Sequence, residues 1–174
     1  HEVLGRRRLA QGKWTPPISV LKPLSRADEH LYQNLRSFCE QDYPTFQVLF
    51  GVQDANDPAV RVVDRLVAEF PHLDLRLIVN DRIIGANHKI SNVANLCRQA
   101  QHAVLVLADS DMRVDRDYLR AVVTPLQDDS VGLVTCLYRS ANEPCARSGV
   151  KSMTSNGSAL ESEPPPSKRG ATGQ

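Results

Sequence analysis

The sequence has few aromatic residues, no long apolar run and almost no net charge, and each shortage excludes a class of protein. Phe, Tyr and Trp make up 5% of the 174 residues, which leaves little material for stacking RNA bases. The formal net charge of +1 provides no general attraction to nucleic acid, and we expect no nucleic-acid partner. No apolar run approaches the roughly 20 residues that cross a bilayer. The remaining composition, 41% hydrophobic and 24% charged, is typical of a globular domain.

Several common site motifs are also missing. Cys39, Cys97, Cys136 and Cys145 are scattered without a C-x-x-C pair, which excludes a zinc pattern or a disulfide framework and favours a reducing compartment. Neither the Walker A pattern nor the G-x-G-x-x-G dinucleotide pattern occurs. No G-x-S-x-G elbow surrounds Ser110, which argues against a Ser-His-Asp hydrolase.

Between Pro17 and Arg139, β-rich runs alternate with segments of helical periodicity. The predicted strands are Ile18–Leu21, Phe46–Val52, Leu75–Val79, Ala103–Ala108 and Val131–Leu137. The predicted helices run from an Asp28 N-cap through Phe38, from Val60 to Phe70, from Ile90 to Ala100, and through Tyr118 to Val122. Such alternation predicts an α/β fold with a mostly parallel sheet.

The two ends of the chain differ from this core. Residues 1–16 form a basic arm containing Arg6–Arg8 and Lys13, which either lies against anionic lipid head groups or is a solvated charged segment. Residues 140–174 are rich in Ser, Gly, Pro, Glu and Lys and predict disorder. We interpret this stretch either as a functional tail or as the product of a shifted reading frame or of cloning.

Asp109 and Asp111 follow the most apolar of the predicted strands. On extended backbone, residues i and i+2 project to the same side, so the two carboxylates are expected to converge. Like charges this close repel unless a cation lies between them, and oxygen ligands without cysteine favour Mg²⁺ or Mn²⁺. Such a cation would neutralise a diphosphate leaving group. The alternative is a loop or helix cap with two solvated aspartates.

Two other polar groups also follow predicted strands. Asp54 and Asp57 are suited to accept hydrogen bonds from a base or a ribose, although Asp57-Pro58 is also a typical helix start. Lys89 follows a turn at Gly85 and enters a helix, where a phosphate would meet it and the backbone N–H groups. Because ligands of open α/β sheets bind beyond the carboxyl ends of the strands, we expect these groups at one edge.

A series of short motifs occurs in a fixed order along the chain. They are Val20–Leu24, Asn34-Leu35 with Phe38, Asp42–Pro44, Val52–Asp54 with Asp57-Pro58, Gly85–Lys89 with Asn92, Asp109–Asp111 with Arg113-Val114, and Gly132–Val134. As an ordered set they resemble the ceramide glucosyltransferase family of GT-A enzymes, and most closely its bacterial branch that glycosylates hopanoid lipids. The resemblance extends from Pro17 to Arg139.

The resemblance implies a GT-A (nucleotide-diphospho-sugar transferase) fold and transfer of glucose or N-acetylglucosamine from a UDP-sugar to a lipid hydroxyl, with inversion. It implies that both Asp54 and Asp57 bind the nucleotide-sugar, with Asp57 at the family's first acidic position and Asp54 where related enzymes hold the uracil-ribose part of the donor. Asp109 falls in the motif for the metal and the diphosphate, and Asp111 completes its D-x-D. Lys89 matches a family lysine, for which we infer a contact with phosphate. The full-length protein is expected at the cytoplasmic face of a membrane.

The sequence also departs from the family pattern. The family continues with a third acidic residue, expected to be the base for the acceptor hydroxyl, then an R/Q-x-x-R-W motif and membrane helices. We find none of these, and Glu143 matches neither context nor spacing. The sequence therefore predicts a donor-binding half-domain over residues 17–139, with an incomplete sheet, no identified catalytic base and little transferase activity. The alternatives are a non-catalytic nucleotide-binding module or remnant, and a receiver-like phosphate-binding domain, which would not explain the motif order.

Overall fold

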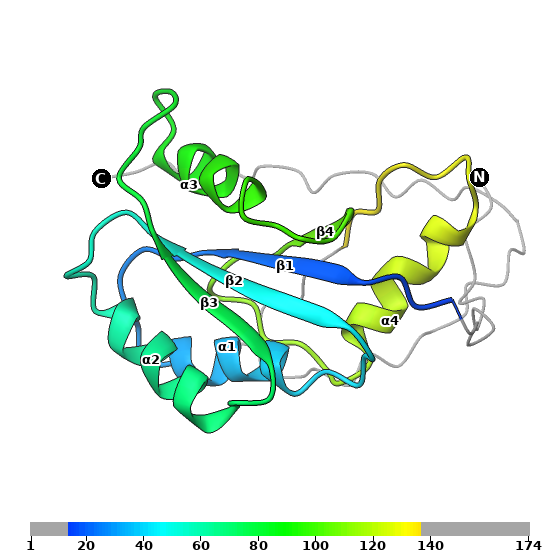
Figure 1. Ribbon diagram of the computed structural model, residues 1–174, viewed down its shortest axis with the longest axis horizontal. Helices are drawn as coiled ribbons and strands as arrows, with labels where there is room; N and C mark the ends of the chain where they lie inside the picture. Colours follow the sequence, from blue (N-terminus) through cyan, green and yellow to red (C-terminus); the bar gives the residue numbers. More distant parts are fainter. Residues whose placement is uncertain (1–13, 137–174) are drawn as a thin grey trace, which may run out of the picture. The chain divides into compact units, whose positions relative to one another are not determined.

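The computed structural model describes residues 14–136 and contains the predicted alternation of strands and helices (Figure 1). In chain order the elements are β1 (Ile18–Pro23), α1 (Leu31–Cys39), β2 (Phe46–Val52), α2 (Ala59–Glu69), β3 (Asp74–Val79), α3 (His88–Cys97), β4 (Val104–Leu107), α4 (Tyr118–Val123) and a 3₁₀ turn, η1 (Thr124–Gln127). The four strands form one sheet in the order β3-β2-β1-β4, and every neighbouring pair is parallel. The predicted α/β fold class is confirmed.

The two central strands are the most deeply buried. Every residue of β1 is buried, and so is all of β2 after Phe46. A parallel strand covered on both faces reads as a continuous apolar run, which is why these segments were recognisable in the sequence. The register pairs Pro23 of β1 with Gly51 of β2, and Leu21 of β1 with Leu107 of β4. The carboxyl ends of these strands are therefore level, and the loops that follow them leave from one edge.

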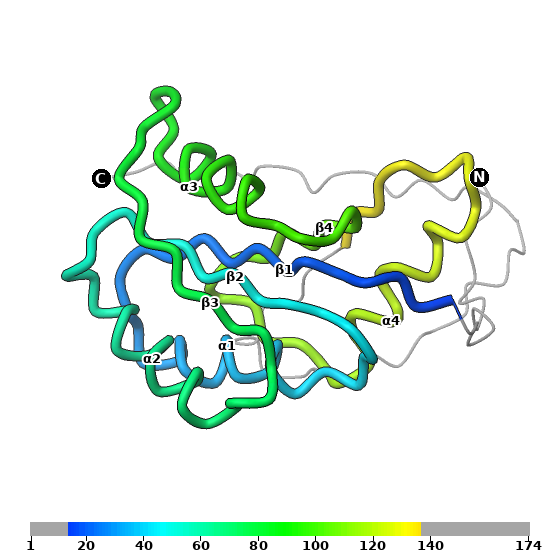
Figure 2. Tube along the Cα trace, in the orientation of Figure 1, coloured from blue at the N-terminus to red at the C-terminus, as the bar shows by residue number. Residues whose placement is uncertain are grey.

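Helices cover both faces of the sheet, but unequally. Figures 1 and 2 show α1, α2 and α4 on one side of the sheet and α3 alone on the other. On the first side, Leu35, Phe38 and Val63 belong to the larger cluster of buried apolar side chains. On the second side, α3 closes a small cluster of Leu21, Leu49 and Leu96. Most of the hydrophobic core therefore lies beneath α1, α2 and α4.

A glycine allows α3 to approach the sheet closely. A Cβ built on Gly51 would lie 2.3 Å from Oδ1 of Asn92 and 2.9 Å from the Leu96 side chain, distances that real side chains do not tolerate. Asn92, buried on α3, donates a hydrogen bond from Nδ2 to the Gly51 carbonyl at 2.8 Å. The absence of a side chain at position 51 thus determines how near the first turns of α3 lie to the ends of β1 and β2.

Some predicted boundaries were wrong. The strand expected over Val131–Leu137 is not formed at residues 131–136, where the backbone pairs with no strand of the described sheet and Leu133 is 81% exposed. Asp28 is not the N-cap of α1, which begins at Leu31; its side chain instead accepts the His30 N–H in the preceding turn. α3 begins two residues earlier than Ile90, because Asn87 caps it by accepting the Ile90 N–H.

The two ends assigned from composition fall largely beyond the part of the chain that the structure describes. Residues 1–13 of the basic arm and the whole of 140–174 lie outside it. Between residues 14 and 136, no helix combines the length and the hydropathy needed to cross a bilayer.

Candidate functional site

The predicted site residues follow strands that end at the same edge of the sheet. Backbone hydrogen bonds continue the sheet slightly beyond the strands, from the Ala108 N–H to the Leu21 carbonyl at 3.1 Å and from the Leu24 N–H to the Gly51 carbonyl at 2.8 Å. Asp109 comes directly after this extension of β4. The parallel topology therefore delivers the polar loops of β1, β2 and β4 to one place, as expected for a ligand site of an open α/β sheet.

Two predicted site residues that lie far apart in the sequence are in contact. Nζ of Lys89, in the first turn of α3, is 2.6 Å from Oδ1 of Asp109. Both side chains remain about half exposed, at 52% for Lys89 and 41% for Asp109. An ion pair this open to water adds little to stability and exchanges its partners readily. The contact therefore supplies a cation to the Asp109 carboxylate without burying either group.

The Asp109–Asp111 segment is a turn and not the extended backbone that the sequence argument assumed. The Asp109 carbonyl accepts the Met112 N–H at 3.3 Å, and Ser110 and Asp111 form the turn itself. The charges of both carboxylates act on the ammonium of Lys22. The extended i, i+2 geometry from which the sequence predicted their convergence is therefore not the geometry of this segment.

The chemistry of this donor set fits Mg²⁺ or Mn²⁺. Among residues 14–136 there is no cluster of three or more His, Cys, Asp or Glu side chains that would hold a metal alone. Asp109 and Asp111 supply carboxylate oxygens, and Asp111 is exposed. Magnesium-type sites commonly use one or two carboxylates and complete their coordination with water and substrate phosphates. The pair therefore suits a cation that arrives with a phosphorylated ligand.

Asp57 and Asp54 have different surroundings in the loop after β2. The carboxylate of Asp57 bridges two backbone N–H groups, of Ala59 and of Arg26, each at 2.9 Å. The first contact satisfies the N–H of the first residue of α2, although the N-cap position of this helix is Pro58 and not Asp57. Asp54 is exposed, and its Oδ1 accepts from the backbone and the side chain of Asn56 at 2.8 and 3.1 Å.

The loop after β2 is also tied to the start of α3. Oε1 of Gln53 faces Nδ1 of His88 at 3.1 Å, where the oxygen can only accept, and the Gln53 amide nitrogen donates to the His88 carbonyl at 3.4 Å. His88 thus holds a loop, and within residues 14–136 it is part of no cluster of three or more metal-ligating side chains. This contact links the segment that carries Asp54 to the helix turn that carries Lys89.

Sequence reasoning missed the most unusual residue of the site, which is Lys22. It is 0% exposed near the end of β1, on the face covered by α1, and its Nζ donates a hydrogen bond to the backbone carbonyl of Asp109. Nζ also lies 3.9 Å from the centre of the Phe38 ring. Burial lowers the pKa of Lys22 to about 7, although the charges of Asp109 and Asp111 act in the opposite direction.

A signal for Lys22 was present in the sequence. Ile18, Val20 and Leu24 alternate along the same strand and all face the large apolar cluster. Period-2 alternation places Lys22 in that stripe, facing α1 rather than solvent. A lysine in a buried apolar stripe is rare unless it is paired, so its register alone marked it as a candidate for function.

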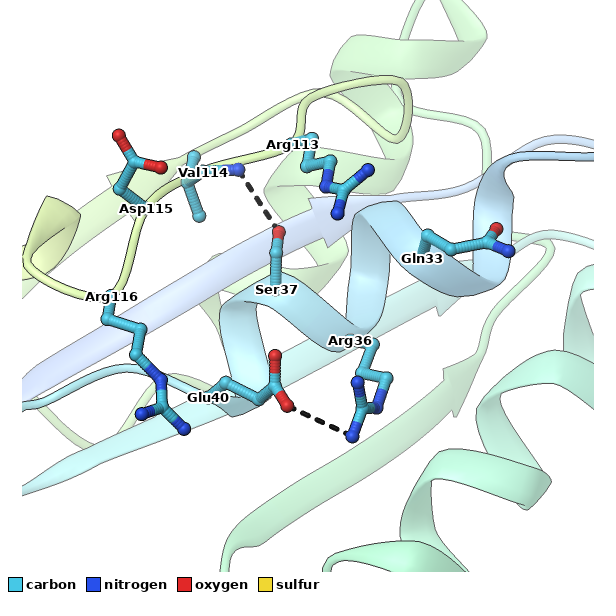
Figure 3. A pocket seen from close by; sticks show the side chains of 8 residues that line it. All are labelled: Gln33, Arg36, Ser37, Glu40, Arg113, Val114, Asp115 and Arg116. Atoms are coloured by element: carbon cyan, nitrogen blue, oxygen red, sulfur yellow. Dashed lines mark hydrogen bonds and ion pairs between the residues drawn. The ribbon is translucent and has the colours of Figure 1, made fainter.

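One surface hollow lies beside this edge of the sheet, and another lies on the flank of α1. The first, of about 380 Å³, is bordered by residues 55–58, 60 and 61 and therefore includes Asp57. The second, of about 330 Å³, contains none of the predicted site residues (Figure 3). In Figure 3 the loop after Asp111 passes over α1, and the Val114 N–H donates to Ser37 Oγ at 3.1 Å. Only the first hollow is continuous with a predicted binding residue.

Comparison with known proteins identifies the family of this chain. The model of glycosyl transferase family 21 matches residues 2–162. Ceramide glucosyltransferase 3 of Caenorhabditis elegans is 31% identical over 121 residues, which are 69% of this chain and 26% of that protein. Ceramide glucosyltransferase of Komagataella phaffii is 29% identical over 101 residues, or 56% of this chain and 20% of that protein. The chain thus spans about a quarter of the length of the curated relatives it matches.

Solved structures show the same architecture. The mannosyltransferase PcManGT from Pyrobaculum calidifontis, in complex with GDP-Man and Mn²⁺, matches 73% of this chain and 37% of its own with a TM-score of 0.65 and 27% identity. S. aureus TarS 1–349, in complex with UDP-GlcNAc, matches 64% of this chain and 31% of its own with a TM-score of 0.52. At 21% identity the second likeness concerns the fold alone. These neighbours are GT-A glycosyltransferases, which confirms the predicted fold class.

Proposed function

The chain belongs to glycosyl transferase family 21, and from that premise we propose that it binds the nucleotide-sugar donor of a lipid glycosyltransferase. The donor is a UDP-sugar carrying glucose or N-acetylglucosamine, and the acceptor is a lipid hydroxyl of the ceramide or hopanoid type. The names of the relatives support the lipid acceptor. The solved neighbours bound to GDP-Man and UDP-GlcNAc support a nucleotide-sugar ligand.

In this proposal Asp109 and Asp111 bind Mg²⁺ or Mn²⁺. The neighbour solved with Mn²⁺ and the two-carboxylate donor set support such a cation. Bound there, the cation would neutralise the charge that develops on the departing diphosphate. Lys89 then contacts the phosphates, because its present partner is an exposed carboxylate that the cation would take over.

Asp54 and Asp57 are proposed to bind the uracil-ribose part of the donor. Oδ1 of Asp54 is occupied by Asn56, and among residues 14–136 its Oδ2 accepts no hydrogen bond, so this oxygen is available to a base N–H or a ribose hydroxyl. Both oxygens of Asp57 already accept one backbone N–H. A carboxylate oxygen accepts more than one hydrogen bond, and Asp57 borders the 380 Å³ hollow.

The full-length protein is proposed to act at the cytoplasmic face of a membrane, where a lipid acceptor resides, with the basic arm of residues 1–16 against the head groups. Transfer also needs a base for the acceptor hydroxyl. None of the residues described here is assigned that role. We therefore propose donor binding, and not transfer, as the activity of this chain alone.

One observation carries the proposal above the others. The Lys89–Asp109 contact of 2.6 Å joins the Gly85–Lys89 motif to the Asp109–Asp111 motif at the carboxyl edge of a parallel sheet. A cation, the Asp109 carboxylate and the amino end of α3 meet there, and Asp111 lies two residues further along the chain. Such a combination is suited to a diphosphate bound with a divalent metal ion.

Calorimetric titration of the 174-residue chain with UDP, with and without Mn²⁺, tests the proposal. We expect binding that requires Mn²⁺ and that is lost in the Asp109→Ala/Asp111→Ala variant. Asp64→Ala, an exposed aspartate on α2, is the matched control and should bind as the wild type does. Absence of binding by the folded wild-type chain would overturn the proposal. A radiolabelled UDP-glucose assay with ceramide then separates donor binding alone from transfer.

A further inference from the structure

Lys22 occupies a place that an apolar residue would fill more stably. Ile18 and Val20, its neighbours in the same stripe of β1, are fully buried in the large apolar cluster, and so is Lys22. Taking an ammonium out of water costs free energy, and replacing a buried charge by an apolar residue of similar volume is often neutral or stabilising. The needs of the fold therefore do not explain a lysine at this position.

The hydrogen bond of Lys22 is directed at the start of the Asp109–Asp111 turn. Within the described chain, the Asp109 carbonyl is the oxygen that accepts a hydrogen bond from Nζ, while the Phe38 ring covers the ammonium at 3.9 Å. The same carbonyl accepts the Met112 N–H that closes the turn. Lys22 thus hydrogen-bonds to the same carbonyl group of Asp109 that closes the turn.

We propose that Lys22 is a positioning residue that anchors the Asp109 peptide and so holds the Asp109 and Asp111 carboxylates ready for a divalent cation and the donor diphosphate. This inference rests on the proposed function. Its structural basis is the approach of two lysines from opposite faces of the sheet: Lys89 meets the Asp109 carboxylate from the α3 side, and Lys22 meets the Asp109 backbone from the α1 side.

The two lysines therefore have separate tasks. Lys89 is exposed, and its carboxylate partner passes to the metal ion when the donor binds. Lys22 is buried, touches no carboxylate oxygen in the described structure, and stays in place beneath the turn. Preorganisation of this kind lowers the cost of assembling the site.

Lys22→Met tests the proposal because methionine has a similar length, packs well against an aromatic ring and has no donor or charge. We expect the melting temperature of the variant to be unchanged or higher than that of the wild type. Its affinity for UDP in the presence of Mn²⁺ should fall by about tenfold, the effect of losing a hydrogen bond from a charged donor. In the unliganded chain, amide hydrogen exchange at residues 110–112 should accelerate.

Ser19→Ala is the matched control on the same strand. Ser19 is fully buried, donates to Gln47 Oε1 at 2.7 Å and accepts the His102 N–H at 3.1 Å, far from the turn. Loss of the hydroxyl removes both hydrogen bonds and leaves the His102 N–H without this partner, so the melting temperature should fall. The UDP affinity and the exchange at residues 110–112 should not change. The two variants are thus expected to move stability and binding in opposite ways.

Each outcome has a distinct meaning. If the folded wild-type chain binds no UDP with Mn²⁺, the proposed function fails, while the exchange experiment still tests the anchoring of the turn. If the wild type binds and Lys22→Met binds equally well with unchanged exchange, the positioning role is overturned. If Lys22→Met does not fold, Lys22→Leu removes the donor with another apolar side chain. Wild-type affinity with unchanged exchange in a folded Lys22→Leu overturns the positioning role, and weakened affinity with faster exchange supports it.

Discussion

The two faces of the sheet are built differently. On one face, α1, α2 and α4 cover a large apolar cluster, whereas on the other α3 covers only a small one and is held largely by polar contacts such as Asn92 to the Gly51 carbonyl. Leu105 and Leu107 of β4, which pair with Ser19 and Leu21 and so share the α3 side, are 46% and 50% exposed. The first face supplies stability, and in the proposed function the second presents charged groups to the nucleotide-sugar.

The candidate site lies where these two faces meet at the strand ends. Lys22 reaches Asp109 through the apolar face and is fully buried, whereas Lys89 reaches it from the polar face and is half exposed. The ammonium of Lys22 is therefore held in place, whereas that of Lys89 can change its partner. The difference arises because packing around the aliphatic part of each lysine side chain determines how freely it moves.

The largest difference between the faces should appear when an apolar side chain is shortened. Leu35→Ala, in the large cluster beneath α1, is expected to reduce the free energy of unfolding by about 2–5 kcal/mol. Leu105→Ala, on the half-exposed side of β4, should change it by about 0.5 kcal/mol or less. Urea denaturation of both variants measures the contrast, and equal losses would contradict it.

The second-largest effect is expected where α3 approaches the sheet closely, at Gly51. Gly51→Ala places a Cβ 2.3 Å from Asn92 Oδ1, so α3 must shift, and we expect a loss of about 1–3 kcal/mol in the free energy of unfolding. Because α3 carries Lys89, UDP affinity should fall as well. Gly132→Ala, which meets nothing within 4 Å, is the control and should affect neither quantity. Wild-type stability in Gly51→Ala would mean that the helix is not held against this glycine.

The exposed ion pair should affect binding and hardly affect stability. Lys89→Ala removes a half-exposed contact, and we expect about 0–1 kcal/mol of change in the free energy of unfolding. The affinity for UDP with Mn²⁺ should nevertheless fall, and added salt should reduce the difference from wild type. Arg98→Ala, an exposed cation at the other end of α3, serves as the control. A large stability loss in Lys89→Ala would show that the pair is structural.

The smallest effect concerns the two cysteines on opposite faces. Burial raises the pKa of Cys39, beneath α1, to about 12, while Cys97 on α3 is exposed. At pH 8, in a chain with Cys136 and Cys145 changed to Ser, a thiol reagent should modify Cys97 rapidly and Cys39 only on unfolding. Equal rates would contradict the difference in burial.

The raised pKa of Cys39 also predicts how stability changes with pH. The thiol stays protonated in the folded chain, whereas in the unfolded chain it ionises near pH 9. The contribution of Cys39 to the free energy of unfolding is therefore complete below pH 9 and is lost as the pH rises toward about 12. Urea midpoints of wild type and Cys39→Ala at pH 8 and pH 10.5 should show a steeper decline for the wild type. A parallel decline would contradict the assignment.

Much of the fold could be predicted because parallel strands and amphipathic helices leave strong local patterns. β2 was predicted at its exact bounds, and the other strands of the sheet within two residues. The strand predicted over Val131–Leu137 failed at residues 131–136 because an apolar run becomes a strand only where a neighbour accepts its hydrogen bonds. The capping error at Asp28 has a similar cause, since Asp side chains stabilise turns as well as helix starts.

For the candidate site, the sequence by itself determined which acidic and basic groups follow which strands, because residue order and the parallel α/β rule suffice for that. It could not determine contacts. Only the tertiary structure joined Lys89 to Asp109, made a turn of Asp109–Asp111 and brought Lys22 beneath it. The physical reason is that local patterns record each segment's own preferences, whereas these contacts depend on the packing of α1 and α3 against opposite faces of one sheet.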